Sequence, residues 1–150
     1  MRTRKHAGFT LIEIMAVVLI IGLLTAVVGT AIFGQIDRAN ATAAKTQIKQ
    51  LEAALDFYRM DNARYPTTDQ GLEALVQQPS VEPVPRHYRP EGYLQGGRVP
   101  SDPWGQPFGY ESPGTHNPYG VDLWSFGADG QPGGSGADAD VGNWAEDTSS

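Results

Sequence analysis

The glycine-rich segment 122–144 carries the residues of this sequence best suited to bind a metal ion. Three of its four carboxylates, Asp129, Asp138 and Asp140, lie among glycines, and no lysine or arginine occurs from Pro100 onward. Calcium prefers six to eight hard oxygen ligands, and glycine lets backbone carbonyls turn inward, so these aspartates and the loop carbonyls match its demand. Repulsion among unpaired acids also favours a cation if the loop is closed. The alternative is a solvated acidic turn that binds no ion.

A second distinctive residue is Glu13, the only charged residue between Phe9 and Phe33. That apolar stretch is long enough to span a bilayer, and a carboxylate within it costs about 2.5 to 3.5 kcal/mol on insertion. A cut after Gly8 would leave a free amine on Phe9, one helical turn from Glu13. The two charges would then neutralise each other within a subunit, or between the subunits of a staggered helical assembly. The alternatives are an ordinary signal peptide or a plain membrane anchor.

Charge is distributed unevenly along the chain. Arg2, Arg4 and Lys5 precede the apolar stretch, which predicts a cytoplasmic N-terminus and a head across the membrane. The net charge is −6, and the acidic C-terminal third repels nucleic acid, so we expect no nucleic-acid partner.

No pattern in the sequence indicates catalysis. The histidines, His6, His87 and His116, have no metal-ligand spacing, and no Gly-x-Ser-x-Gly occurs. The sequence also has no cysteine, so no disulfide can stabilise the head. We therefore expect a protein that is not an enzyme.

The distribution of proline divides the chain into a helical part and a turning part. All 11 prolines occur from Pro66 onward, so a continuous helix is predicted from about Thr10 to about Asp61. Its second half is amphipathic. The apolar stripe that we expect to pack against the head consists of Ile48, Leu51, Leu55 and Tyr58.

The remainder predicts a small head of mixed structure. A short helix capped by Thr67 or Thr68 would turn Leu72, Leu75 and Val76 inward. An extended loop over 79–97 follows, which Tyr88 and Tyr93 are expected to pin, and the strand candidates are 107–111 and 119–126. The predicted fold class is α+β: a long N-terminal helix packed against a head with a short helix and a small antiparallel sheet.

These patterns divide the chain into four segments. They are a basic leader at 1–8, a transmembrane helix at 9–33, a head with the amphipathic half of the helix at 34–144, and a frayed tail at 145–150.

The stretch Arg4-Lys5-His6-Ala7-Gly8-Phe9-Thr10-Leu11-Ile12-Glu13 resembles the processing motif of type IV prepilins. Further stretches extend this resemblance over nearly the whole chain to the family of major pseudopilins of the type II secretion system. They are residues 58–72, Asp102-Pro-Trp104-Gly105, Ser125-Phe-Gly-Ala-Asp129-Gly and Asp140-Val-Gly-Asn-Trp144.

The resemblance implies cleavage after Gly8 by the prepilin peptidase, methylation of the Phe9 amine and assembly through Glu13. It implies a homopolymer in the inner membrane of a Gram-negative bacterium, with periplasmic heads, that exports folded proteins through the outer membrane. Its expected partners are further copies of the chain, the minor pseudopilins and the inner-membrane assembly platform. A type IV pilin for adhesion or motility is the alternative, although such pilins commonly carry a C-terminal disulfide.

The resemblance also implies a calcium ion that holds the C-terminal loop. By position, its ligands are the carbonyls of Phe126 and Val141 and the side chains of Asp129 and Asp140. Asp138 or a carbonyl near Ser135 fills the remaining places. The sequence departs from the family at Thr30, where a proline is usual, which removes any kink that depends on that proline.

Overall fold

The computed structural model describes residues 8–144, except the side chains of 29–33. Residues 1–7 of the basic leader, the tail 145–150 and the Thr30 side chain lie outside the described part. The chain divides into two compact units, Met1–Ile36 and Asp37–Ser150, and one helix contributes to both.

That helix, α1 (Leu11–Asn62), has 52 residues. Its backbone runs without interruption through Thr30, as expected of a sequence with no proline in this stretch. It ends where Ala63 adopts a left-handed φ of 61°, three residues before Pro66. The long helix predicted from about Thr10 to about Asp61 is confirmed.

The first unit contains the apolar part of α1. Residues Leu11–Val28 have a mean hydropathy of 2.8, and none of this window is buried within the structure. Length and composition make it the one helix of the described chain that qualifies as a membrane span. The Thr25 hydroxyl donates to the Ile21 carbonyl over 2.8 Å, so this polar group is satisfied inside the helix.

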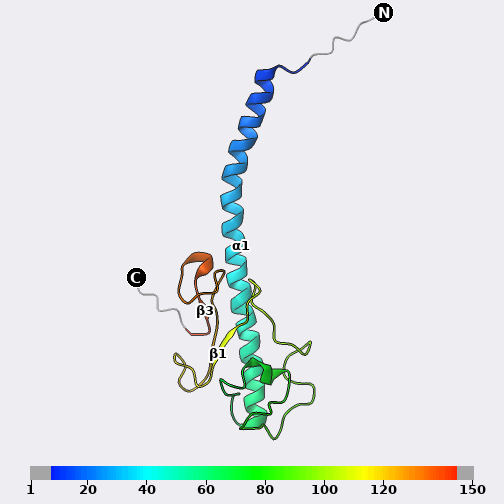
Figure 1. Ribbon diagram of the computed structural model, residues 1–150, viewed down its shortest axis with the longest axis vertical. Coiled ribbons are helices and arrows are strands. Elements are labelled where there is room, and N and C mark those ends of the chain that lie inside the picture. The colour runs from blue at the N-terminus through cyan, green and yellow to red at the C-terminus, as the bar shows by residue number, and fades with distance from the viewer. Residues whose placement is uncertain (1–7, 145–150) are drawn as a thin grey trace, which may run out of the picture. The chain divides into compact units, whose positions relative to one another are not determined.

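The second unit is built on the amphipathic half of α1, and Figure 1 shows strands beside this part of the helix. The predicted stripe is confirmed, since all four of its residues are buried. The core residues of α1 are Ala44, Ile48, Leu51, Ala54, Leu55 and Tyr58, and they cluster with Leu72, Ala74, Leu75, Phe108, Val121, Leu123 and Val141.

The short helix of the head is a single 3₁₀ turn, η1 (Leu72–Leu75), and the predicted threonine cap is wrong. Thr67 and Gln70 instead close the preceding turn, because each backbone N–H donates to the other's side-chain oxygen, over 3.1 and 3.2 Å. Gly71, at φ 61°, then separates this turn from η1. Leu72 and Leu75 are buried as expected, and Val76 is half-buried.

The loop after η1 is held by aromatic contacts, as predicted for Tyr88 and Tyr93. Their rings lie 5.4 Å apart, and both lie against Tyr58 of α1. The Asn62 side chain donates to the Tyr93 hydroxyl over 3.1 Å. This cluster ties the proline-rich loop to the end of α1.

The sheet has three antiparallel strands in the order β1 (Gly109–Glu111), β2 (Asp122–Ser125) and β3 (Val141–Gly142). The first two lie within the predicted ranges but are shorter. The third was not predicted, because two residues are too few to show an alternating pattern. It pairs through Trp124↔Gly142 and Ser125↔Val141.

Candidate assembly and metal sites

The residues predicted for processing are exposed at the start of the first unit. Phe9 is 79% exposed, and among the described residues beyond its chain neighbours Gly8 has no atom within 4 Å of the place that a Cβ would occupy. The described part of the chain therefore covers neither residue.

Glu13 has a local role that was not predicted. Its carboxylate accepts a hydrogen bond from the Thr10 backbone N–H over 3.4 Å, and its own N–H donates to the Thr10 hydroxyl over 3.3 Å. This is a reciprocal capping box at the first turn of α1. Its signal, threonine followed three residues later by glutamate, is present in the sequence.

The candidate metal loop, residues 126–141, begins and ends at two paired strands. Ser125, the last residue of β2, pairs with Val141, the first residue of β3. Phe126 follows the first of these partners and Asp140 precedes the second. Three of the five predicted ligands therefore lie at one strand end.

Backbone hydrogen bonds close the loop further along. The Ala128 N–H donates to the Ala137 carbonyl over 2.9 Å, and the Asp140 N–H donates to the Gly133 carbonyl over 3.2 Å. A short 3₁₀ turn, η2 (Gly136–Asp138), lies between these contacts. The first of these bonds joins Ala128 and Ala137, so Asp129 and Asp138 each come directly after one of the two bonded residues.

The three aspartates differ in their surroundings. Asp129 is exposed and accepts from the Gln131 N–H over 3.0 Å, and Asp138 is exposed on η2. Asp140 Oδ2 accepts from the Gly133 N–H over 2.9 Å. Asp140 Oδ1 is buried and has no hydrogen-bond partner within residues 8–144.

An unsatisfied buried carboxylate oxygen is costly, and a cation is the partner that its charge favours. Within the described part, no three His, Cys, Asp or Glu side chains are grouped to hold a metal ion. The three aspartates are therefore not one carboxylate cluster, and a calcium site here needs backbone carbonyls as well. The donors present at the strand end fit such a site, because hard oxygen atoms are the ligands of calcium.

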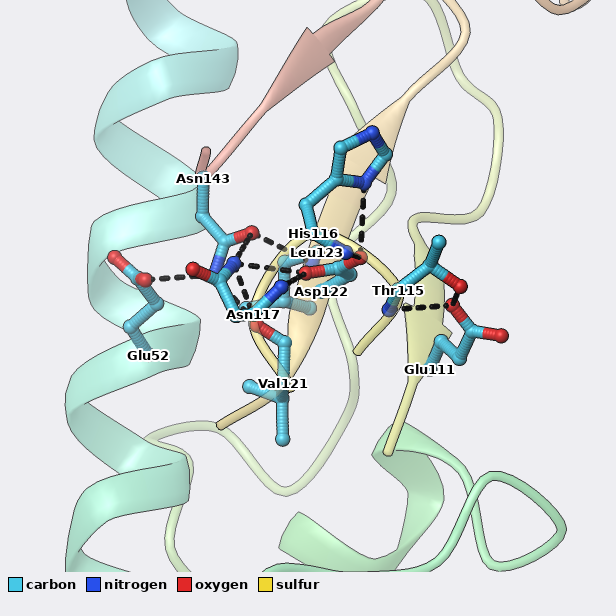
Figure 2. Close-up of polar contacts among 9 residues, drawn as sticks. All are labelled: Glu52, Glu111, Thr115, His116, Asn117, Val121, Asp122, Leu123 and Asn143. Carbon is cyan, nitrogen blue, oxygen red and sulfur yellow. Dashed lines mark hydrogen bonds and ion pairs between the residues drawn. The ribbon is translucent and has the colours of Figure 1, made fainter. Parts of the chain in front are cut away.

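A second polar cluster holds the other end of the sheet, and Figure 2 shows it between α1 and the segment before β2. Asp122 has a side chain only 1% exposed. It accepts from the backbone N–H groups of His116 and Asn117 over 2.7 and 3.0 Å and from the Asn117 side chain over 2.8 Å, and it pairs with the His116 imidazole Nδ1 over 3.0 Å. Burial acts to raise the pKa of the Asp122 carboxyl, but these hydrogen bonds outweigh it, so the pKa lies below its ordinary value of 3.8.

Asn143 connects this cluster to both neighbouring elements. Its side chain donates to Glu52 Oε1 and to the Val121 carbonyl, and it accepts from the Leu123 N–H over 3.0 Å. No role was predicted for Asn143. No local pattern signals one, because its partners lie 20 to 91 residues away.

Comparisons with known proteins identify the family of the chain. Residues 31–144 match the family described as type II secretion system (T2SS), protein G, and residues 3–29 match the prokaryotic N-terminal methylation motif. The family is one of structural secretion-system subunits rather than of enzymes. The matched region includes the head, which favours this family over the type IV pilin alternative.

Similar curated proteins include the type II secretion system core protein G of three bacteria. The Pseudomonas aeruginosa protein is 51% identical over 96% of this chain and 99% of its own length. The Vibrio cholerae protein is 50% identical over 95% of this chain and 94% of its own length. The Escherichia coli protein is 44% identical over 95% of this chain and 93% of its own length.

A solved structure is similar as well. The crystal structure of the major pseudopilin from the type 2 secretion system of enterohaemorrhagic Escherichia coli aligns with a TM-score of 0.65 at 44% identity, covering 75% of this chain and 92% of the other. With the family match over residues 31–144, this places the chain in the type II secretion system protein G family, as a major pseudopilin with an N-terminal methylation motif.

Proposed function

We propose that this chain is the structural subunit that polymerises into the periplasmic pseudopilus and so drives export of folded proteins across the outer membrane. The observation that carries the proposal is the apolar window Leu11–Val28, which is unburied within the chain and has Glu13 as its single charge. An apolar helix of this kind needs lipid or other copies of itself to cover it.

Processing at the N-terminus prepares the subunit for assembly. The prepilin peptidase cuts between Gly8 and Phe9, and the Phe9 amine is then methylated. The leader lies on the cytoplasmic side of the inner membrane and the head lies in the periplasm, as the basic residues of the leader favour.

Glu13 sets the register between neighbouring subunits. In the uncut chain its carboxylate accepts from the Thr10 N–H. Cleavage creates a cationic amine at Phe9, one turn away, which offers Glu13 a charged partner within its own subunit or in the next. A buried ion pair of this kind often adds little stability, and its main contribution here is to specify the register between subunits.

A calcium ion stabilises the head of each subunit. The support is the buried Oδ1 of Asp140, which has no hydrogen-bond partner within residues 8–144 and lies beside the strand end of Ser125 and Val141. Asp129 and Asp140 supply side-chain oxygens, and Phe126 and Val141 supply carbonyls. Asp138 or a carbonyl near Ser135 completes the shell. The bound cation neutralises an acidic segment that contains no lysine or arginine.

The test is to replace Glu13 in the full chain and to express it in a strain that lacks its own subunit. Glu13→Ala should be cleaved normally but should lose filaments in electron micrographs and secretion of a folded exoprotein. Thr25→Ala, which removes a hydroxyl bonded within the helix, is the matched control and should assemble normally. Wild-type filament yield and secretion with Glu13→Ala would contradict the proposal.

A further inference from the structure

Asp102 is a buried carboxylate outside the predicted metal ligands, and it lies beneath the candidate metal loop. It is 5% exposed. Its Oδ2 accepts from the Ser125 hydroxyl over 2.5 Å. Its Oδ1 accepts from the backbone N–H groups of Trp104 and Gln106, over 3.1 and 2.7 Å. One carboxylate therefore closes its own turn and contacts the end of β2.

Ser125 connects Asp102 to the start of the loop. It is fully buried, and its Oγ accepts from the Gly127 N–H over 3.2 Å while its hydroxyl donates to Asp102. Ser125 also precedes Phe126 and pairs with Val141. Its side chain thus holds the strand end from which two predicted carbonyl ligands project.

Gln106 supports the loop at a second point. A Cβ on Gly130 would lie 2.3 Å from Gln106 Oε1 and 2.5 Å from its Nε2, so the loop backbone beside Asp129 rests directly on this amide. Because Asp102 Oδ1 accepts from the Gln106 N–H, the same carboxylate holds the residue beneath Gly130.

We propose that Asp102 is a positioning residue for the metal loop, acting through Ser125 at the loop's entrance and through Gln106 beneath Gly130. This inference rests on the calcium site of the proposed function. Asp102 does not contact the ion in this proposal. It holds the backbone in the arrangement that brings the carbonyl of Phe126 and the side chain of Asp129 toward it, and outer residues of this kind commonly change metal affinity about 10- to 100-fold.

The experiment compares four variants of the full chain in detergent micelles. Ser125→Ala removes the hydroxyl that donates to Asp102, and Asp102→Ala removes the carboxylate that accepts it. Gln106→Ala removes the half-buried side chain beneath Gly130. Tyr110→Phe is the matched control. It removes one hydroxyl from a sheet residue whose partner is the Pro66 carbonyl, away from the loop.

Two quantities are measured for each variant. Calorimetry gives the dissociation constant for calcium, and hydrogen exchange in chelator gives the protection of the Gly127, Ala128, Gly133 and Asp140 amides. We expect calcium affinity to fall about tenfold in the three test variants, with faster exchange at these four amides. Tyr110→Phe should change neither quantity, even if it lowers overall stability.

The outcomes separate this inference from the calcium proposal. Wild-type affinity and unchanged exchange in Ser125→Ala and Gln106→Ala would overturn the positioning role and leave the calcium site standing. If the wild-type chain binds no calcium, the calcium site of the proposed function is refuted. Hydrogen exchange in chelator then tests by itself whether Asp102, Ser125 and Gln106 position the loop. Faster exchange in Ser125→Ala and Gln106→Ala than in Tyr110→Phe then supports it, and equal exchange overturns it.

Discussion

The side-chain amide of Asn143 donates to Glu52 Oε1 over 2.8 Å and so connects the residue after β3 to helix α1 across 91 residues of chain. The same amide donates to the Val121 carbonyl, and the Asn143 carbonyl oxygen accepts from the Leu123 N–H. One side chain thereby joins the C-terminal strand, the central strand and the helix.

Replacing Asn143 with alanine should destabilise the head by about 2 to 4 kcal/mol, because it removes several part-buried hydrogen bonds and leaves their partners unsatisfied. The measurement is chemical denaturation of the full chain in detergent. Glu52→Gln, which keeps an acceptor for the Asn143 amide, is the milder companion variant and should cost about 1 kcal/mol or less. An unchanged midpoint for Asn143→Ala would show that these bonds contribute nothing.

Acid should weaken the head through Asp122. Its folded-state pKa lies below the unfolded value near 3.8, so its contribution to the free energy of unfolding is fully present above that value. The contribution is lost as the pH falls through the lower folded pKa. Unfolding of the wild type and of Asp122→Asn is measured from pH 6 to pH 2. The wild-type advantage should shrink below about pH 4, and parallel curves would contradict this.

Calcium should raise the thermal unfolding midpoint of the full chain relative to chelator. At a free concentration 100 times the dissociation constant, a ligand that binds only the folded state adds about 2.7 kcal/mol. Asp129→Ala and Asp140→Ala should each abolish the shift, whereas Asp69→Ala, at an exposed position before η1, should retain it. A shift that survives in Asp140→Ala would remove this residue from the site.

Gly8→Val should leave uncut precursor, visible as a larger band on a gel. Within the described residues, apart from its chain neighbours, no atom lies within 4 Å of a Cβ at this position, so a valine there clashes with no described part of the fold. A processing defect would therefore report recognition by the peptidase. Thr10→Ser, which keeps the capping hydroxyl, should be processed normally. Normal cleavage of Gly8→Val would refute the leader assignment.

Gly109→Ala should destabilise the sheet by about 1 to 3 kcal/mol or more through overpacking. A Cβ at this position would lie 2.0 Å from the Trp124 ring, which covers the glycine across β1 and β2. Gly120→Ala is the matched control, since its Cβ would meet only Asn117 at an ordinary 3.7 Å. Denaturation of the two variants should separate them, and equal midpoints would mean that the Trp124 ring moves aside freely.

The long helix and its buried face were predictable because both depend on local sequence. An α-helix repeats every 3.6 residues, so the spacing of Ile48, Leu51, Leu55 and Tyr58 identifies the buried face without knowledge of its partners. The processing motif around Gly8 and Glu13 was equally readable, because its residues are contiguous. The start of the short helix was predicted at Thr67 or Thr68, too early in the chain. Thr67 can bond with Gln70 in a turn as readily as it can cap a helix.

The sequence by itself therefore determined the apolar helix, the N-terminal methylation motif, the family motifs and the acidic character of the C-terminal loop. Only the tertiary structure decided that Val141 and Gly142 form a strand, that Asp102 contacts Ser125, and that Asn143 reaches Glu52. The physical reason is the range of the interactions. A two-residue strand exists only through its partner, and hydrogen bonds between residues tens of positions apart leave no periodic pattern in the sequence.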